Sequence, residues 1–299
     1  MCELLAISSD LAAEITLSLM TFAEHGGFTG PHRDGWGIAY YAGRDVRLIR
    51  EAEAAADSDW VRFITDHALT SQMVIAHIRH ATRGARSIAN TQPFIRELGG
   101  RIHTFAHNGD LPDMLAAGWS ATHRFQPVGE TDSERAFCLL LERLADAQST
   151  SDGPPALAER LAIFADFAGE MRALGPANFL YSDGEYLFAH GDRRKQAASG
   201  LIEPPGLMRL RRQCPAHDGG GIDGQERPGG FESDGLRITG AGHGREQHVV
   251  VLASVALTDE AWEPFAAGEI AVLGDGAIVA RKRPGHEADF ATGRSGPVG

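Results

Sequence analysis

Apolar and polar residues alternate over short stretches of this chain with the period of two that is typical of β-strands, and turn residues separate these stretches. Asp183-Gly184 and Asp275-Gly276 are dipeptides that favour tight hairpins, and Ala42-Gly43 occupies a similar place. The pattern predicts strands over residues 2–8, 37–41, 46–50, 73–79, 102–106, 179–181, 186–188, 249–255, 270–272 and 278–279.

Four other segments carry apolar residues at helical spacing. The first begins at Ser9 or Asp10 and stops before Gly26-Gly27, with the apolar stripe Leu11, Ile15, Leu19 and Phe22. The second covers residues 57–69 and places Trp60, Phe63 and Ile64 on one face. The third follows the capping-box pattern that runs from Thr131 to Glu134, and the fourth covers residues 155–174.

Together these elements predict an α+β fold with two groups of mainly antiparallel strands and helices between them. The window 205–245 differs, because it holds 11 of the chain's 36 glycines and almost no apolar periodicity. We expect a mobile insertion there, since such a segment cannot offset its ordering entropy by burial. We also expect residues 284–299 to form a disordered tail, which leaves 2–283 as one domain.

Composition narrows the class of protein. The chain has 299 residues, 43% of them apolar, and a formal net charge of -12. This acidic balance argues against nucleic acid as the partner, since binding phosphates needs a basic face. No apolar run approaches the roughly 20 residues that span a bilayer, and the first residues lack a basic signal-peptide start. Three cysteines are too few for a disulfide framework, so we expect a cytoplasmic protein.

Cys2 is the cysteine with an informative position. A methionine that precedes a small residue is normally removed, which would leave Cys2 with a free α-amine beside its thiol. The amine has a reference pKa of about 7.7–8.0 and the thiol one of about 8.5. One residue can then supply both nucleophile and base. Taken alone, however, a cysteine at position 2 is more often a small apolar filler.

Two further segments place polar groups at the ends of predicted strands. Arg79 ends one strand, where a guanidinium can hold a carboxylate through two hydrogen bonds, although a surface ion pair is the simpler interpretation. Asn108 and Gly109 end another strand, and an amide beside a glycine N–H can form an oxyanion hole. A plain Asn-Gly turn is the common alternative. Thr131-Asp132 is most simply a helix N-cap.

In this order the segments resemble the class II glutamine amidotransferases, which are N-terminal-nucleophile hydrolases. The resemblance covers residues 2 to about 140. It rests on Cys2, Arg33-Asp34-Gly35-Trp36-Gly37, Arg79-His80-Ala81-Thr82, Asn90-Thr91-Gln92-Pro93-Phe94, His107-Asn108-Gly109 and Thr131-Asp132-Ser133-Glu134. It implies a four-layer αββα sandwich in which two mainly antiparallel sheets lie between helices.

The resemblance also implies a role for each matching residue. Cys2 would attack the side-chain amide of glutamine or of another γ-glutamyl amide and form a thioester, which water resolves to glutamate. Asn108 and the Gly109 N–H would hold the oxyanion. Arg79, with Thr82 beside it, would bind the α-carboxylate of the substrate. Asp132 would bind the α-ammonium group. Supporting positions are Arg33, Gly35, Trp36 and His107. Neither a metal nor an organic cofactor is implied.

His80 and Arg83 stand where synthase-type members carry a tryptophan and a second histidine. The chain is more similar to the stand-alone bacterial members, which include glutaminase-like proteins and a γ-glutamyl amide hydrolase of ergothioneine assembly. Two alternatives remain open beside an independent amidohydrolase. One is a glutaminase subunit that passes ammonia to a separate synthase, and the other is a non-catalytic amino-acid sensor. Homodimers are common in the family, so a homodimer is a further expectation.

Other candidates have simpler interpretations. A metal site at His77, His80, His103 and His107 is disfavoured, because their helical spacing falls on predicted strands. Cys138 lies in an apolar helix and fits a core position, and Cys214 with His217 lacks further ligands for zinc.

Overall fold

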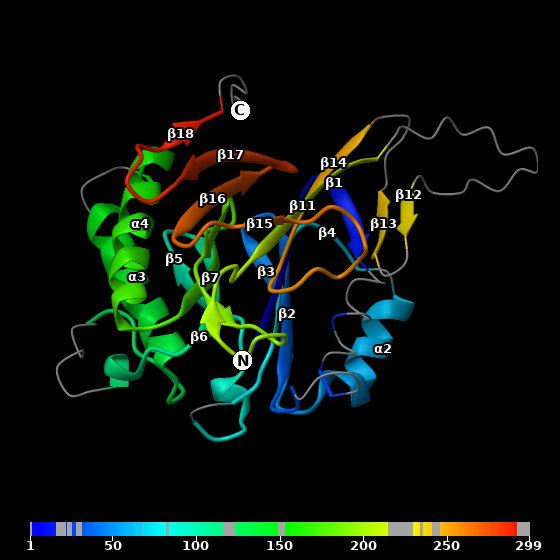
Figure 1. Ribbon diagram of the computed structural model, residues 1–299, viewed down its shortest axis with the longest axis horizontal. Coiled ribbons are helices and arrows are strands. Elements are labelled where there is room, and N and C mark those ends of the chain that lie inside the picture. Colours follow the sequence, from blue (N-terminus) through cyan, green and yellow to red (C-terminus); the bar gives the residue numbers. More distant parts are fainter. Residues whose placement is uncertain are drawn as a thin grey trace, which may run out of the picture.

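The computed structural model describes residues 2–15, 22, 26–27, 32–67, 69–81, 84–115, 123–148, 153–214, 230–233, 236–240 and 246–291. These residues form two antiparallel sheets (Figure 1). In the first sheet the order is β15-β11-β14-β1-β4-β2-β3, with β13 beside β1 and β12 beside β13. The second sheet has the order β18-β17-β16-β8-β7-β6-β5.

The first sheet consists of β1 (Glu3–Ile15), β2 (Trp36–Ala42), β3 (Asp45–Glu51), β4 (Thr70–Ile78), β11 (Met208–Cys214), β12 (Gly230–Ser233), β13 (Leu236–Gly240), β14 (Gln247–Ala253) and β15 (Glu263–Pro264). The second consists of β5 (Phe94–Leu98), β6 (Arg101–Gly109), β7 (Ala177–Ser182), β8 (Leu187–Gly191), β16 (Glu269–Gly274), β17 (Ala277–Lys282) and β18 (Asp289–Phe290). A small ribbon joins β9 (Arg194–Lys195) to β10 (Ile202–Glu203). The α-helices are α2 (Asp59–Asp66), α3 (Asp132–Gln148) and α4 (Leu157–Leu174), and single 3₁₀ turns cover Ala55–Asp57, Ile88–Asn90 and Pro112–Leu115.

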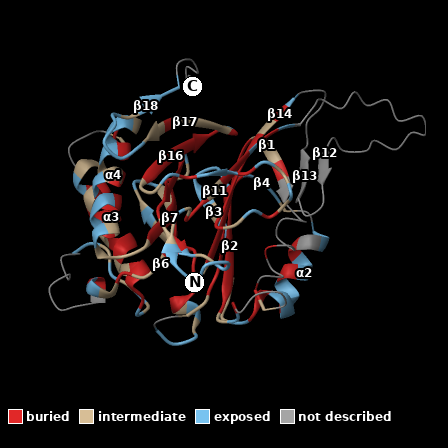
Figure 2. Ribbon diagram, in the orientation of Figure 1, coloured by how far each residue is buried: buried red, intermediate tan, exposed pale blue. Residues whose placement is uncertain are grey.

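Three hydrophobic clusters separate four layers, which confirms the predicted αββα sandwich. Leu4 and Ile75 of the first sheet pack against Ala106 of the second in the cluster between the sheets. On the far side of the second sheet, α3 and α4 cover an aromatic cluster that includes Phe105. Helix α2 covers the outer face of the first sheet (Figure 1). The central strands of both sheets are accordingly buried, whereas the outer faces of the helices and the edge strand β18 are exposed (Figure 2).

The helix predicted from Ser9 or Asp10 is wrong over its first residues, because β1 continues to Ile15. Ala13 pairs with Ser71 on one side and with Gly240 on the other, after an irregularity in the β1–β4 register. The apolar spacing of this segment fits a strand as well as a helix, and pairing with distant strands makes it a strand. Leu19 lies outside the described residues, and Phe22 is buried in the outer cluster.

The window 205–245 is more regular at its start than its glycine content predicts. Residues 208–214 form β11, which pairs along its whole length with β14. Strands β12 and β13 pair with each other, and β13 also pairs with β1. Residues 215–229, 234–235 and 241–245 lie outside the described part of the chain. In the predicted tail, β18 pairs with β17, and residues 292–299 lie outside the described part.

Helix α2 is confirmed, but its buried face differs from the prediction. Val61 and Ile64 are buried, whereas Trp60 is 48% exposed and Phe63 is 43% exposed. Ser58 caps this helix by accepting hydrogen bonds from the N–H groups of Trp60 and Val61. Among the helices that the structure describes, none combines the length and the apolar character needed to cross a membrane.

Candidate active site

Cys2 lies at the start of β1, on the side that faces the second sheet. Leu4 and Ala6 belong to the cluster between the sheets, and Cys2 continues the same alternation. Its Sγ accepts a hydrogen bond from the His80 N–H at 3.3 Å and lies 3.5 Å from the His80 carbonyl oxygen. Burial raises the pKa of the Cys2 thiol, which the His80 N–H and the Arg79 charge only partly oppose. Burial thus favours the neutral form of this thiol.

Arg79 follows β4 directly opposite the start of β1, since Ile78 pairs with Glu3. Its guanidinium is buried and donates to the carbonyl oxygens of Ala85 at 3.0 Å and Gly84 at 3.2 Å. Burial lowers the pKa of Arg79, and the nearby Cys2 and Asp34 oppose that shift. These contacts fix a cation beside the thiol.

The loop before β2 holds Arg79 in place. The Arg79 N–H donates to the Gly35 carbonyl at 2.8 Å, and the Asp34 carboxylate accepts from the Ala81 N–H at 2.8 Å. Gly35 has φ +132°, and a Cβ there would lie 2.9 Å from the Glu51 carbonyl oxygen. Glycine is therefore required at this position of the loop.

Asn108 ends β6 and faces the first sheet, like Ala106 two residues earlier. Its side chain is fully buried, and Nδ2 donates to the Ser254 Oγ at 3.1 Å. The same Oγ accepts from the Leu4 N–H at 3.0 Å, so one hydroxyl connects Asn108 to the strand that carries Cys2. The Asn108 Oδ1 has no hydrogen-bonding partner among the described residues. At Gly109 a Cβ would lie 1.9 Å from the Pro176 carbonyl oxygen.

Asp132 and His107 lie on the helical side of β6. The Asp132 carboxylate is buried and accepts from the N–H groups of Leu111 at 2.7 Å and Ser133 at 2.8 Å. His107 Nδ1 lies 2.9 Å from the Ser133 Oγ, and its backbone N–H donates to the Gln92 Oε1 at 2.6 Å. Burial lowers the pKa of His107. Asp132 is near enough to Cys2 for its charge to contribute to the raised thiol pKa.

The remaining expected site residues are less central. Trp36 faces the outer cluster of the first sheet, away from Cys2, and its Nε1 donates to the Glu51 carboxylate at 3.0 Å. Arg33 is exposed and donates to the Gly27 carbonyl at 2.8 Å. Thr82 and Arg83 lie outside the described residues. The structure thus brings Cys2, Arg79, Asn108 and Asp132 into one region and places Trp36 on another face.

Three residues at the site had no predicted role. Ser254 joins Asn108 to β1, and Asn178 donates to the Asn108 carbonyl at 2.9 Å. Gln92 receives the His107 N–H. Gln92 belongs to one of the motifs that carry the resemblance, so the sequence could have indicated it. Ser254 directly follows one apolar strand and Asn178 lies at the start of another, and neither position has a recognisable pattern.

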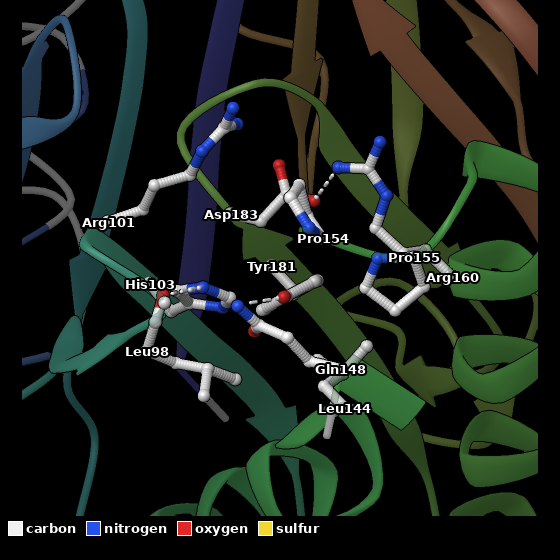
Figure 3. A pocket seen from close by; sticks show the side chains of 11 residues that line it. Leu98, Arg101, His103, Leu144, Gln148, Pro154, Pro155, Arg160, Tyr181 and Asp183 are labelled. Atoms are coloured by element: carbon white, nitrogen blue, oxygen red, sulfur yellow. Dashed lines mark hydrogen bonds and ion pairs between the residues drawn. The ribbon is translucent and has the colours of Figure 1, made fainter. Parts of the chain in front are cut away.

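His103, one of the four histidines considered for a metal site, lies in a polar cluster of the second sheet. His103 Nδ1 lies 2.8 Å from the Tyr181 hydroxyl, beside the ion pair of Arg160 and Asp183 at 2.6 Å (Figure 3). The cavity at this cluster has a volume of about 20 Å³, which suits a water molecule and no substrate. Within the described ranges, no three His, Cys, Asp or Glu side chains gather as a metal site.

Cys138 lies in α3, away from Cys2, and burial raises the pKa of its thiol to about 11.

The comparisons with known proteins agree with this fold. The sequence matches the family described as "Glutamine amidotransferases class-II" over residues 1–295. The chain therefore belongs to the class II glutamine amidotransferases.

Individual relatives carry the same type of name. YafJ of Escherichia coli K12, named as a candidate glutamine amidotransferase, is 41% identical over 190 residues, 64% of this chain and 72% of YafJ. A Haemophilus influenzae protein named in the same way is 39% identical over 193 residues, 64% of this chain and 63% of that protein. The crystal structure of a predicted glutamine amidotransferase from Pseudomonas aeruginosa PA01 has a TM-score of 0.62 and 33% identity, and covers 93% of this chain and 100% of that chain.

A more distant structure shows the shared fold alone. The glutamine phosphoribosylpyrophosphate amidotransferase of B. subtilis has 15% identity and a TM-score of 0.55. The match covers 97% of this chain and 49% of that chain.

Proposed function

We propose that this protein hydrolyses the side-chain amide of glutamine or of a related γ-glutamyl amide through a thioester on Cys2. The observation that carries the proposal is that the charges of Arg79 and Asp132, which are of opposite sign, both act on the buried Cys2 thiol, while Ser254 joins Asn108 to β1 beside it. An amino-acid end carries both a carboxylate and an ammonium group, and this pair of charges is complementary to it.

In the proposed reaction, removal of Met1 exposes the Cys2 α-amine, which takes the thiol proton. The sulfur then attacks the side-chain amide carbon, and the carbonyl oxygen becomes an oxyanion. Collapse of this intermediate breaks the C–N bond, and the amine returns the proton to the leaving ammonia or amine. Water attacks the thioester and releases glutamate and the thiol. The raised thiol pKa is the reason that a neighbouring base is needed.

Asn108 is the proposed oxyanion donor, and Ser254 sets the orientation of its amide. A half-turn of the amide places Oδ1 where the Ser254 hydroxyl can donate to it, while the same Oγ still accepts the Leu4 N–H. That arrangement satisfies the otherwise unpartnered Oδ1 and leaves Nδ2 available for the oxyanion, together with the Gly109 N–H.

The decisive experiment combines intact mass spectrometry with an assay of glutamate release. We expect the purified protein to lack Met1 and to hydrolyse glutamine or a γ-glutamyl amide, and Cys2→Ala to lower the rate by roughly 10³-fold or more. Cys138→Ala is the matched control, because it removes a thiol from α3 and none from the proposed site. A protein that retains Met1, or a Cys2→Ala variant with full activity, contradicts the proposal.

The same assay separates the alternatives. Glutamate release that occurs only when cell extract is added indicates a subunit that passes ammonia to a separate synthase. Saturable binding of glutamine without release, in protein that lacks Met1, indicates a sensor.

A further inference from the structure

A second cavity, with a volume of about 340 Å³, lies between α4 and the ends of β8, β16 and β17. Its α4 wall consists of small residues, among them Ala168 and Gly169, which leave room above the sheet. A Cβ added at Gly169 would meet nothing within 4 Å. This volume lies in the range of small-molecule sites.

Basic side chains surround this cavity. Arg172 comes from α4, His190 from β8, Lys282 from the end of β17, and Arg283 and His286 from the loop that follows. None of the described lining residues carries a carboxylate. Asp192 stands behind Arg172 and accepts from its Nε at 2.9 Å, so one of the three permanent cations is already neutralised.

Lys282 and Arg283 are not neutralised in this way, since neither has an ion-pair partner within the described part of the chain. Two cations without an ion-pair partner in the described part of the chain therefore lie at one cavity, on a protein with a formal net charge of -12. The net negative charge of the molecule repels anions. An anion that binds at this cavity must therefore be attracted by the positive charges of Lys282 and Arg283.

His190 adds a buried polar group to the cavity. It is 1% exposed, and its Nδ1 has no hydrogen-bonding partner among the described residues. Burial and the nearby Arg172 lower the pKa of His190 to about 3, so the ring is neutral. A bound anion would offset the repulsion by Arg172 and raise that pKa.

We propose that this cavity binds a small phosphate ester, with its phosphate held by Arg283, Lys282 and Arg172. A guanidinium and an ammonium group match the multiple charge and the several acceptor oxygens of a phosphate group. The volume exceeds what a bare phosphate needs, so the rest of the ligand lies over the small residues of α4.

One row of paired residues in the second sheet runs from this cavity to His107. His107 pairs with Phe179, Phe179 with His190, His190 with Ile270, and Ile270 with Lys282. The rings of His107 and His190 both stack on Phe179, at centroid distances of 4.9 and 5.6 Å. The proposed phosphate site therefore lies on the same face of the sheet as His107.

The test is calorimetric titration of the full chain with inorganic pyrophosphate at low ionic strength. We expect saturable binding at one site, weakened about tenfold or more by Arg283→Ala or Lys282→Ala. Arg62→Ala is the matched control, because it removes an exposed cation from α2. Gly169→Leu should also abolish binding by filling the cavity, whereas Ala162→Leu adds the same side chain to an exposed position of α4 outside the lining.

Four results overturn the proposal. The first three are the absence of saturable binding, binding that survives both Arg283→Ala and Gly169→Leu, and binding that citrate outcompetes at equal concentration. Displacement of pyrophosphate by glutamate places the anion near Arg79 and also contradicts it. Because the readout is binding, its outcome is independent of whether the protein hydrolyses glutamine.

Discussion

At the scale of single residues, the contacts around Cys2 join segments that are far apart in the sequence. The Ser254 Oγ bonds Leu4 and Asn108, and the Gln92 side chain bonds the His107 backbone. Such contacts leave no local pattern, because Ser254 is an ordinary serine after an apolar strand. The candidate residues Cys2, Arg79, Asn108 and Asp132 could be proposed from sequence, as could Gly35 beside Arg79. Ser254 and Asn178, which hold Asn108, could not.

Ser254→Ala should lower kcat about tenfold with little change in KM, because the Asn108 amide loses the group that orients it, whereas the charges proposed for substrate binding remain. Steady-state kinetics of glutamate release measures both constants. Ser254→Thr keeps the hydroxyl and should restore much of kcat. A Ser254→Ala protein that is less stable but has an unchanged kcat would show that Ser254 is only structural.

At the scale of elements, local turn chemistry and long-range pairing account for different parts of the fold. The predicted hairpin at Asp275-Gly276 forms with φ values of 47° and 69°, as its residue types require. The sequence pattern does not predict strand β11, because arginines interrupt the alternation of apolar residues there. Arg209 is buried there only because Glu263 and Glu269 bind it at 3.0 and 2.7 Å, and these partners are more than 50 residues away.

Gly37→Ala tests how β2 supports the site. A Cβ at Gly37 would lie 2.4 Å from the Gln92 carbonyl oxygen, so the segment that carries Gln92 must move. The hydrogen bond that the Gln92 Oε1 accepts from the His107 N–H is then lost. We expect a loss of about 2 kcal/mol or more in the free energy of unfolding, measured with urea. Gly153→Ala is the control, since its Cβ meets nothing within 4 Å. Equal stability of the two variants contradicts this account of the contact.

At the scale of the whole molecule, buried neutral histidines make stability depend on pH. Burial lowers the pKa of both His77 and His190 to about 3, from an ordinary value of 6.5. The unfolded chain therefore binds protons before the folded protein does as the pH falls. The stability contributed by each neutral ring is present above pH 6.5 and is lost progressively as the pH falls from 6.5 toward 3.

Each of these rings should account for a loss of about 2 kcal/mol between pH 7 and pH 5. His77→Phe removes one titrating group and two ring nitrogens without a partner among the described residues, so the variant should lose about 2 kcal/mol less than the parent over this interval. Urea unfolding at the two pH values measures the difference, with the exposed His123→Gln as control. An unchanged pH dependence in His77→Phe would falsify the assignment.

The central place of β1 has a consequence for the order of folding. This strand carries the proposed nucleophile, yet it lies between β4 and β14, and the second of these begins at Gln247. Ser254, which joins β1 to Asn108, comes later still. Contacts of such high sequence separation form late in folding. A growing chain on the ribosome therefore cannot assemble the contacts around Cys2 until Ser254 has emerged, so synthesis itself sets the earliest time at which the proposed chemistry can begin.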